Sequence, residues 1–302
     1  MGLRRLTQFP PLASIKQLDN VINGNESRMT GFLNVAVTLA DRPEITGPFS
    51  LFSNRKGSAS YHIDGKRFTI EENTFLMMNR GQQYDLLIDN KDTTVIQNIH
   101  FNENLIRAAY TTFINSSEQL LDKTINFELL EFNAGMFVKN NSLQQLLDST
   151  SYLGHMEEDE DDSILLAIMD CLFWENDKAR KAALAIPAVK ESVRQELFCR
   201  IRTAQDYMWS NYKNELSIDE LCLEIGMSKF HFLRVFKSCI GCSPYQYLKS
   251  VRHQRALHLL RTSKMMIQEI AFQLGYEVVN SFIKSFHQIE GVSPQKFREK
   301  IK

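Results

Sequence analysis

Two groups of side chains near the C-terminal end of the sequence recur at helical spacing, one around position 230 and the other around position 280. Arg and Lys can donate to O6 and N7 of guanine, Asn can pair with adenine, and Phe or Leu can contact the methyl group of thymine. Ser can serve either a base or a phosphate. Direct reading of DNA bases is therefore the chemistry that these residue types favour. The candidate base-reading residues are Phe230, Leu233, Arg234, Asn280, Ser281 and Lys284.

Both groups lie in a segment that occurs twice. The stretch 221–236 is repeated at 270–286, with the glycines Gly226 and Gly275 separated by 49 residues and Phe236 and Phe286 separated by 50. Each copy has the pattern of a short helix, a tight turn at the glycine and a second amphipathic helix, which predicts a helix-turn-helix unit. Two such units on a rigid frame can read two neighbouring stretches of DNA.

Helical periodicity divides each second helix into an inner and an outer face. The inner faces are predicted to be Phe232, Val235 and Phe236, packed on Leu221 and Ile225, and then Phe282, Phe286 and Ile289, packed on Ile270, Ala271 and Leu274. The candidate base readers lie on the outer faces, and further polar residues there could hold DNA phosphates. The candidate phosphate contacts are Ser228, Lys229, Lys237 and His287.

Capping signals bound these helices. The pattern Ser217-Ile-Asp-Glu220 is a capping box, so we expect a helix to begin at Ile218 and end at Gly226. Ser228 is the expected N-cap of the next helix, which should end at Gly241. A long helix with one apolar face, at Leu248, Val251, Ala256, Leu259 and Leu260, then separates the two copies and can set their spacing.

Charge is distributed unevenly along the 302 residues. The whole chain has a net charge of −1, but the part from Glu191 onward has 17 Lys+Arg against 11 Asp+Glu and is therefore at +6, which leaves −7 upstream. This division fits a DNA-binding part joined to an acidic part with another task. The five cysteines are an odd number, which is typical of a reduced, cytosolic protein, and the Cys239/Cys242 pair is interpreted as packing around a glycine helix end.

The N-terminal part has the pattern of a small antiparallel barrel or sandwich. Short segments rich in β-branched and aromatic residues alternate with the turn signals Asp64-Gly65, Asn79-Arg-Gly81 and Asp89-Asn-Lys-Asp92. The predicted strands are 33–37, 58–63, 68–70, 74–78, 84–88 and 93–101.

Helical spacing begins at about residue 104, and the acidic run 157–162 is expected to be a solvated loop between helices. A linker is expected in the Ala- and Lys-rich stretch around Pro187. The predicted parts are a barrel (1–103), a helical connector and linker (104–190) and a DNA-binding domain (191–302). We also expect the helices between Asn104 and Phe173 to form the dimer interface, with the apolar stripe at Leu165 and Ile168 facing a second subunit.

Residues from about 200 to 298 resemble the DNA-binding domain of the AraC/XylS family of bacterial transcription regulators. The resemblance is carried by Leu216-Ser217, Gly226-Met-Ser228, Phe236-Lys237, Gly241, Ser243-Pro244, Tyr247-Leu248, Arg252, Ala256, Leu259-Leu260, Ile267, Glu269-Ile-Ala271, Gly275-Tyr276, Phe282, Phe286, Gly291, Ser293-Pro294 and Phe297-Arg298. Met266 departs from the family because it stands where a capping residue is common.

The resemblance implies an α+β multidomain protein with a cupin-like N-terminal barrel, a helical connector and an all-α double helix-turn-helix domain. It implies a homodimer that binds double-stranded DNA, with base readers at the six positions named above. It also implies activation of transcription through RNA polymerase, and a small-molecule effector whose binding residues the sequence does not identify. We expect a cytoplasmic protein with no export signal and no membrane span.

Two alternatives remain at this point. The barrel could be a cupin-type enzyme, metal-free or metal-dependent, but His62, Tyr84 and His100 do not form the set of three or four ligands that a catalytic metal needs. The barrel could also only dimerise, in which case Phe49 and Phe52 fill a core rather than line an effector cavity. We expect no enzymatic activity, no catalytic residue, no metal and no cofactor.

Overall fold

The computed structural model describes residues 2–9, 29–116, 132–150 and 158–300. The chain divides into two compact units, Met1–Arg180 and Lys181–Lys302, and the division falls inside one helix, α5 (Glu158–Leu184). Each unit is described by itself. No helix in the described ranges is long and apolar enough to cross a membrane.

The first unit is built on one mixed sheet of eight strands. In chain order these are β1 (Gly2–Leu6), β2 (Met29–Thr46), β3 (Ser50–Lys56), β4 (Ala59–Ile63), β5 (Lys66–Ile70), β6 (Thr74–Met78), β7 (Gln83–His100) and β8 (Gly135–Val138). The sheet order is β1-β2-β7-β3-β6-β8, and the hairpin β4–β5 also pairs with β7. β1 is parallel to β2, and the other pairs are antiparallel. Among the strands that the structure describes, no pairing joins β8 back to β1, so the sheet is not a closed barrel.

Most of the predicted strands are confirmed, and one predicted turn is wrong. The Asp64-Gly65 turn joins β4 to β5 with both residues at positive φ, as a tight hairpin requires. The stretch 89–92, in contrast, does not reverse the chain, because β7 runs straight through it. Val37 pairs with Thr94 and Leu39 pairs with Asp89, so the turn-forming residues are absorbed as a bulge in one long strand.

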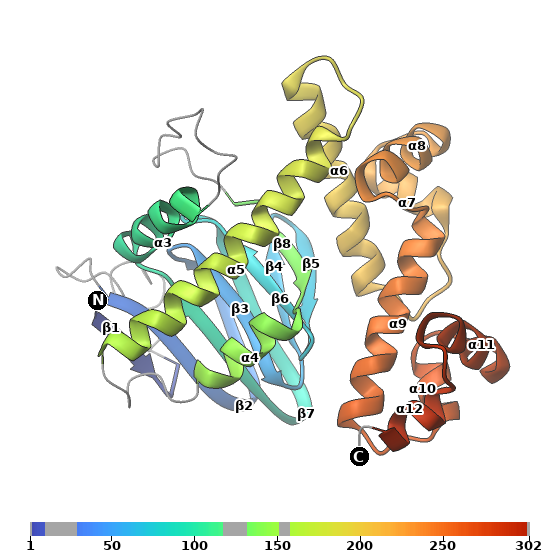
Figure 1. The fold of residues 1–302 in the computed structure, drawn as a ribbon, viewed down its shortest axis with the longest axis horizontal. Helices are drawn as coiled ribbons and strands as arrows, with labels where there is room; N and C mark the ends of the chain where they lie inside the picture. Colours follow the sequence, from blue (N-terminus) through green and yellow to red (C-terminus); the bar gives the residue numbers. More distant parts are fainter. Residues whose placement is uncertain (1, 10–28, 117–131, 151–157, 301–302) are drawn as a thin grey trace. The chain divides into compact units, whose positions relative to one another are not determined.

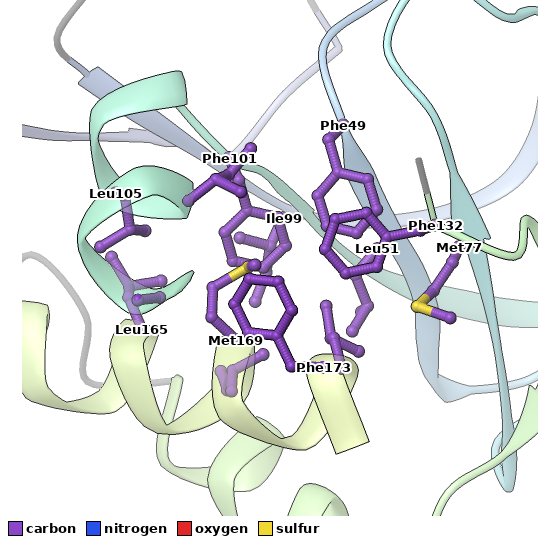
Figure 2. Close-up of a cluster of buried hydrophobic side chains, with 14 of the residues drawn as sticks. Phe49, Leu51, Met77, Ile99, Phe101, Leu105, Phe132, Leu165, Met169 and Phe173 are labelled. Carbon is purple, nitrogen blue, oxygen red and sulfur yellow. The ribbon is translucent and has the colours of Figure 1, made fainter. Parts of the chain in front are cut away.

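Three helices lie against the sheet and complete the core of this unit (Figure 1): α3 (Glu103–Ser116), α4 (Asn141–Ser149) and the long α5. Figure 2 shows Met169 and Phe173 of α5 pointing toward Ile99 and Leu51 of the sheet, and Leu165 lying next to Leu105 of α3. Ile168 is completely buried in the same cluster, so the sheet of the same chain covers this apolar stripe.

Two predictions for α5 and one for the core are settled by these contacts. The prediction that Leu165 and Ile168 face a second subunit is wrong, because both side chains are already buried against their own sheet. The acidic residues from 158 to 162 are not a loop but the first turns of α5, where carboxylates are favoured by the helix dipole. Phe49 does fill the core, stacked on Phe101 and Phe132.

The helix α5 also continues through the expected linker as far as Leu184, because Ala and Lys are strong helix formers. The chain leaves helical structure only at 185–190, around Pro187. Of the stretch with helical spacing that begins at about residue 104, residues 117–131 lie outside the described residues.

The second unit is entirely helical in the described range. Its helices are α6 (Glu191–Ser210), α7 (Ile218–Ile225), α8 (Lys229–Ile240), α9 (Pro244–Thr262), α10 (Ile267–Gln273), α11 (Val279–Glu290) and α12 (Pro294–Lys300). The predicted ends of α7 and α8 are confirmed, because Gly226 and Gly241 end them in the left-handed conformation. The pairs α7–α8 and α10–α11 are the two repeated copies.

Candidate nucleic-acid interface

The inner face of α8 is buried as the periodicity predicts. Phe232 and Phe236 are completely buried with ring centroids 5.4 Å apart, and Val235 lies beside them. Leu221 and Ile225 of α7 are buried in the same unit. Burial of these side chains fixes the rotation of α8, so that its opposite side must face solvent.

That opposite side carries the first group of candidate DNA-binding residues. Phe230, Arg234 and Lys237 are exposed, and Leu233 is half-buried. Phe230 is the most unusual of them, because 86% of its surface is accessible. An exposed phenylalanine beside an arginine on one helix face suits contact with base edges and thymine methyl groups.

The second helix of the other copy, α11, repeats this arrangement at an offset of 50 residues. Phe282 and Phe286 are buried with ring centroids 5.9 Å apart. Lys284 occupies the position equivalent to Arg234, and Asn280 the position equivalent to Phe230. All the predicted outward residues of α11 are exposed: Asn280, Ser281, Lys284 and His287.

Ile289 is a wrong prediction of this periodicity. It belongs to the inward stripe of α11 by spacing, yet it is 48% exposed. It lies in the last turn of α11, which ends at Glu290 with Gly291 as the C-cap. Cys239, at the equivalent place in α8, is buried.

Both α8 and α11 begin without a side-chain cap. Ser228 and Val278 stand at the N-cap positions of α8 and α11, and neither side chain accepts a bond from the first turn. By contrast, Ser217 caps α7 through the amide of Glu220, and Ser243 caps α9. The free amides at the start of a helix point outward and favour an anion such as a phosphate.

One of the candidate phosphate contacts is already paired. The Lys229 Nζ lies 3.0 Å from the Asp219 carboxylate of α7, and the hydrogen bond to Asp219 raises the pKa of Lys229. A DNA phosphate at this lysine must therefore share the ammonium group with Asp219 or displace Asp219. The other three, Ser228, Lys237 and His287, are exposed.

The helix α9 holds both helix-turn-helix units. Leu248, Val251 and Leu260 are buried on its apolar face, as predicted, whereas Leu259 is only half-buried. In its second half, the ring of His253 is tilted against the ring of Phe286, with centroids 5.1 Å apart, and its Nε2 lies 2.8 Å from the carboxylate of Glu290. The linker helix therefore contacts α11 directly.

The thiols of Cys239 and Cys242, near Gly241, are not reactive. Burial raises the pKa of Cys239 to about 11, and burial also raises the pKa of Cys242. Both thiols therefore stay protonated at neutral pH, whereas a nucleophile or a metal ligand needs a thiolate. Among the residues that the structure describes, no group of three or more His, Cys, Asp or Glu side chains is placed to hold a metal ion.

A second group of buried polar and aromatic side chains lies in the first unit, on the face of the sheet opposite to the helices. Phe52 alternates with Leu51 along β3 and therefore points away from the helical core. Its ring lies 4.8 Å from Tyr61, 5.0 Å from Tyr84 and 5.8 Å from His100. The structure thus brings Tyr84 and His100 together, while His62 follows Tyr61 on β4 and points to the other face.

Hydrogen bonds and burial define the chemistry of this aromatic cluster. Nδ1 of His100 lies 2.8 Å from the Ser50 hydroxyl, which donates to the carbonyl of Pro48, so Nδ1 carries the proton in this arrangement. Burial lowers the pKa of His100 to about 4, and burial raises the pKa of Tyr61 and Tyr84. The imidazole and both phenols are neutral at physiological pH. The Nδ2 of Asn98 donates to the Tyr61 hydroxyl at 3.3 Å. The sequence analysis did not identify Ser50, Tyr61 or Asn98, because their place inside the sheet depends on pairings between distant strands.

Comparison with known proteins gives one family match and several relatives. A helix-turn-helix domain family matches residues 221–300. The uncharacterized HTH-type transcriptional regulator YisR of Bacillus subtilis is 24% identical over 252 residues, which cover 83% of this chain and 85% of the relative. The lactose operon transcription activator of Staphylococcus xylosus is 29% identical over 98 residues, and the match covers 32% of this chain but only 35% of that relative.

A solved structure of ToxT from Vibrio cholerae aligns with 89% of this chain and 97% of its own, at 14% identity and a TM-score of 0.38. That score is too low to support a conclusion about a shared fold. The family match and the sequence relatives agree with the paired helix-turn-helix units described above. Residues 221–300 of this chain are therefore similar to a helix-turn-helix domain, and the relatives that match it are named as transcription regulators or activators.

Proposed function

We propose that this protein activates transcription by binding one double-stranded DNA site with α8 and α11 in neighbouring major-groove segments. The observation that carries the proposal is the equivalence of the two outer faces. Arg234 and Lys284 are exposed at the same position of two repeated helices, each opposite a buried pair of phenylalanines. If these two charges were only solvated surface groups, we would not expect them to recur at matching positions of two copies.

The roles of individual residues follow from their chemistry. We assign base reading to Phe230, Leu233, Arg234, Asn280, Ser281 and Lys284, because they lie on or beside the exposed faces and match base-edge chemistry. We assign phosphate contact to Ser228, Lys229, Lys237 and His287, which lie at the ends of the same helices.

Selection of bound duplexes from a random pool by the full chain, followed by footprinting, tests the proposal. Replacing Arg234 or Lys284 by Ala should weaken binding to the selected duplex by about 1–3 kcal/mol and relax the preference at one base position. Arg180→Ala in α5 removes the same charge outside the DNA-binding unit and should leave binding unchanged. Equal weakening by Arg234→Ala on all duplexes would show that Arg234 contacts phosphate instead.

The first unit is proposed to be a cupin-like sensor. Its sheet buries a cluster of polar and aromatic side chains on the face away from the helices, which is the kind of interior that small molecules enter. We propose that effector binding there changes the spacing of two subunits in a homodimer, and that the bound dimer recruits RNA polymerase. In this proposal the protein acts in the bacterial cytoplasm, where its target DNA lies.

Two measurements test the proposed dimer and the proposed effector separately. Light scattering of the purified chain should give the mass of a dimer, and a monomer with full DNA affinity would contradict the dimer. A thermal-shift screen of small metabolites should identify an effector. We propose that the protein is not an enzyme, and a stoichiometric metal in the purified protein would instead favour cupin-type catalysis.

A further inference from the structure

The two repeated copies differ in the loop that precedes each of them. Residues 211–217 join α6 to α7, whereas residues 263–266 join α9 to α10, so the first loop is three residues longer. The longer loop contacts the second helix-turn-helix unit, although in sequence it introduces the first.

The closest contact is between this loop and the turn of the second unit. Gly275 has a φ of +77°, and a Cβ atom built on it would lie only 2.1 Å from the carbonyl oxygen of Lys213. Gly226, at the equivalent turn of the first unit, has a φ of +62°, and its Cβ would meet only the end of the Arg200 side chain, at 3.4 Å. Both turns need a left-handed residue, but only Gly275 also needs the absence of a side chain.

An arginine from the linker helix closes the same contact. The Arg252 Nε donates to the carbonyl of Tyr212 at 2.8 Å, and its Nη2 donates to the carbonyl of Asn214 at 2.9 Å. Its guanidinium also lies over the ring of Tyr276 in the second turn, 5.4 Å from the ring centre. One side chain of α9 therefore holds the loop before α7 and the turn after α10 at once.

We propose that this loop–turn clamp, formed by residues 212–214, Arg252 and Gly275, fixes the spacing at which α8 and α11 meet DNA. Arg252 and Gly275 are then positioning residues. The inference rests on the proposed DNA binding and adds that the two units bind as one rigid reader. With the clamp in place, binding of the first helix positions the second helix over its own segment, so the two binding energies combine only at one separation. Without the clamp, each unit still binds its own segment, but the two binding energies no longer combine at one separation.

The test uses the full chain and the duplex that the wild-type protein selects from a random pool. Three probes are compared: this duplex, the same duplex with one of its two contacted segments scrambled, and versions with base pairs inserted or deleted between the segments. The variants are Gly275→Ala and Arg252→Lys, with Gly226→Ala as the matched control for backbone strain at positive φ.

The clamp predicts a specific split between the probes. Gly275→Ala should lose affinity for the intact duplex by on the order of tenfold, and for the one-segment duplex by less than about twofold. It should also discriminate less between the altered spacings than the wild type does. Gly226→Ala should change both affinities by the same factor and keep the wild-type spacing preference. Arg252→Lys keeps the charge but cannot bind both carbonyls at once, so its affinities for the probes should change in the same direction as those of Gly275→Ala.

Three results would overturn the inference. Gly275→Ala and Arg252→Lys with the spacing preference of the wild type would show that the clamp does not set the spacing. Equal losses on the intact and one-segment duplexes would show a general loss of structure, which circular dichroism of each variant would confirm. Failure of the wild-type chain to select any duplex would instead refute the proposed DNA binding itself.

Discussion

Replacing Ile168 by alanine tests whether α5 belongs to the core of the first unit or to an interface between chains. Ile168 is 0% exposed and lies in one buried cluster with Leu51, Ile99 and Leu165. The substitution removes three carbon groups at about 0.8 kcal/mol each, which gives about 2.4 kcal/mol of lost transfer energy. The cavity left in a close-packed core adds roughly another 1 kcal/mol.

The free energy of unfolding of this unit should therefore fall by about 3 kcal/mol, which corresponds to a decrease of about 10 °C in its melting temperature. Near-ultraviolet circular dichroism and calorimetry of the purified full chain measure the change. Asp170→Ala is the matched control, because Asp170 lies in the same helix and is exposed, and it should change stability by less than about 0.5 kcal/mol.

Light scattering of the same samples completes the test. If Ile168→Ala left the melting temperature unchanged and converted a dimer to a monomer, the residue would face another chain and the core described above would be wrong. Aspartate at position 168 is less informative. It would bury an unpaired carboxylate, which costs several kcal/mol and would unfold the unit whichever view is correct.

Two further predictions concern buried titratable groups. Burial lowers the pKa of His100 to about 4 from its ordinary 6.5. As the pH falls from about 6.5 to 4, the imidazole therefore becomes protonated in the unfolded chain but stays neutral in the folded chain. The free energy of unfolding should decrease through this window by up to about 3 kcal/mol. The substitution His100→Gln should flatten that decrease in acid denaturation curves. Equal slopes for the wild type and the variant would refute a buried neutral imidazole. Burial lowers the pKa of Lys139 to about 7 from 10.5, so the folded state binds fewer protons than the unfolded state between these values. Stability of the wild type relative to Lys139→Met should therefore rise with pH from about 7 to 9 in denaturant titrations, and a flat difference would contradict the shift.

Much of the second unit could be predicted from the sequence because its structure is local. Gly226 and Gly241 end their helices, Ser217 begins one, and Phe232 and Phe236 are buried, all as the spacing predicts. Caps and helical periodicity act within a few residues, so one stretch of sequence contains the whole signal. The exposure of Arg234 and Lys284 follows from the burial of the opposite face.

The first unit was less predictable because its contacts join distant residues. The strands β1, β3 and β8 were missed, and the turn signal at 89–92 became a bulge because the residues on either side of it pair with residues 50 or more positions away. The apolar stripe of α5 was visible in the sequence, but periodicity alone could not say whether the sheet or another chain covers it.

From the sequence alone, the chain has two copies of a helix-turn-helix and a basic C-terminal part, because repeats and charge are properties of residue order. Only the tertiary structure decided what covers α5, which side chains meet Phe52, and how Arg252 and Gly275 join the loop at 212–214 to the second turn. These are contacts between segments far apart in the chain. Their geometry is set by the packing of the whole unit, and no local pattern of residues encodes it.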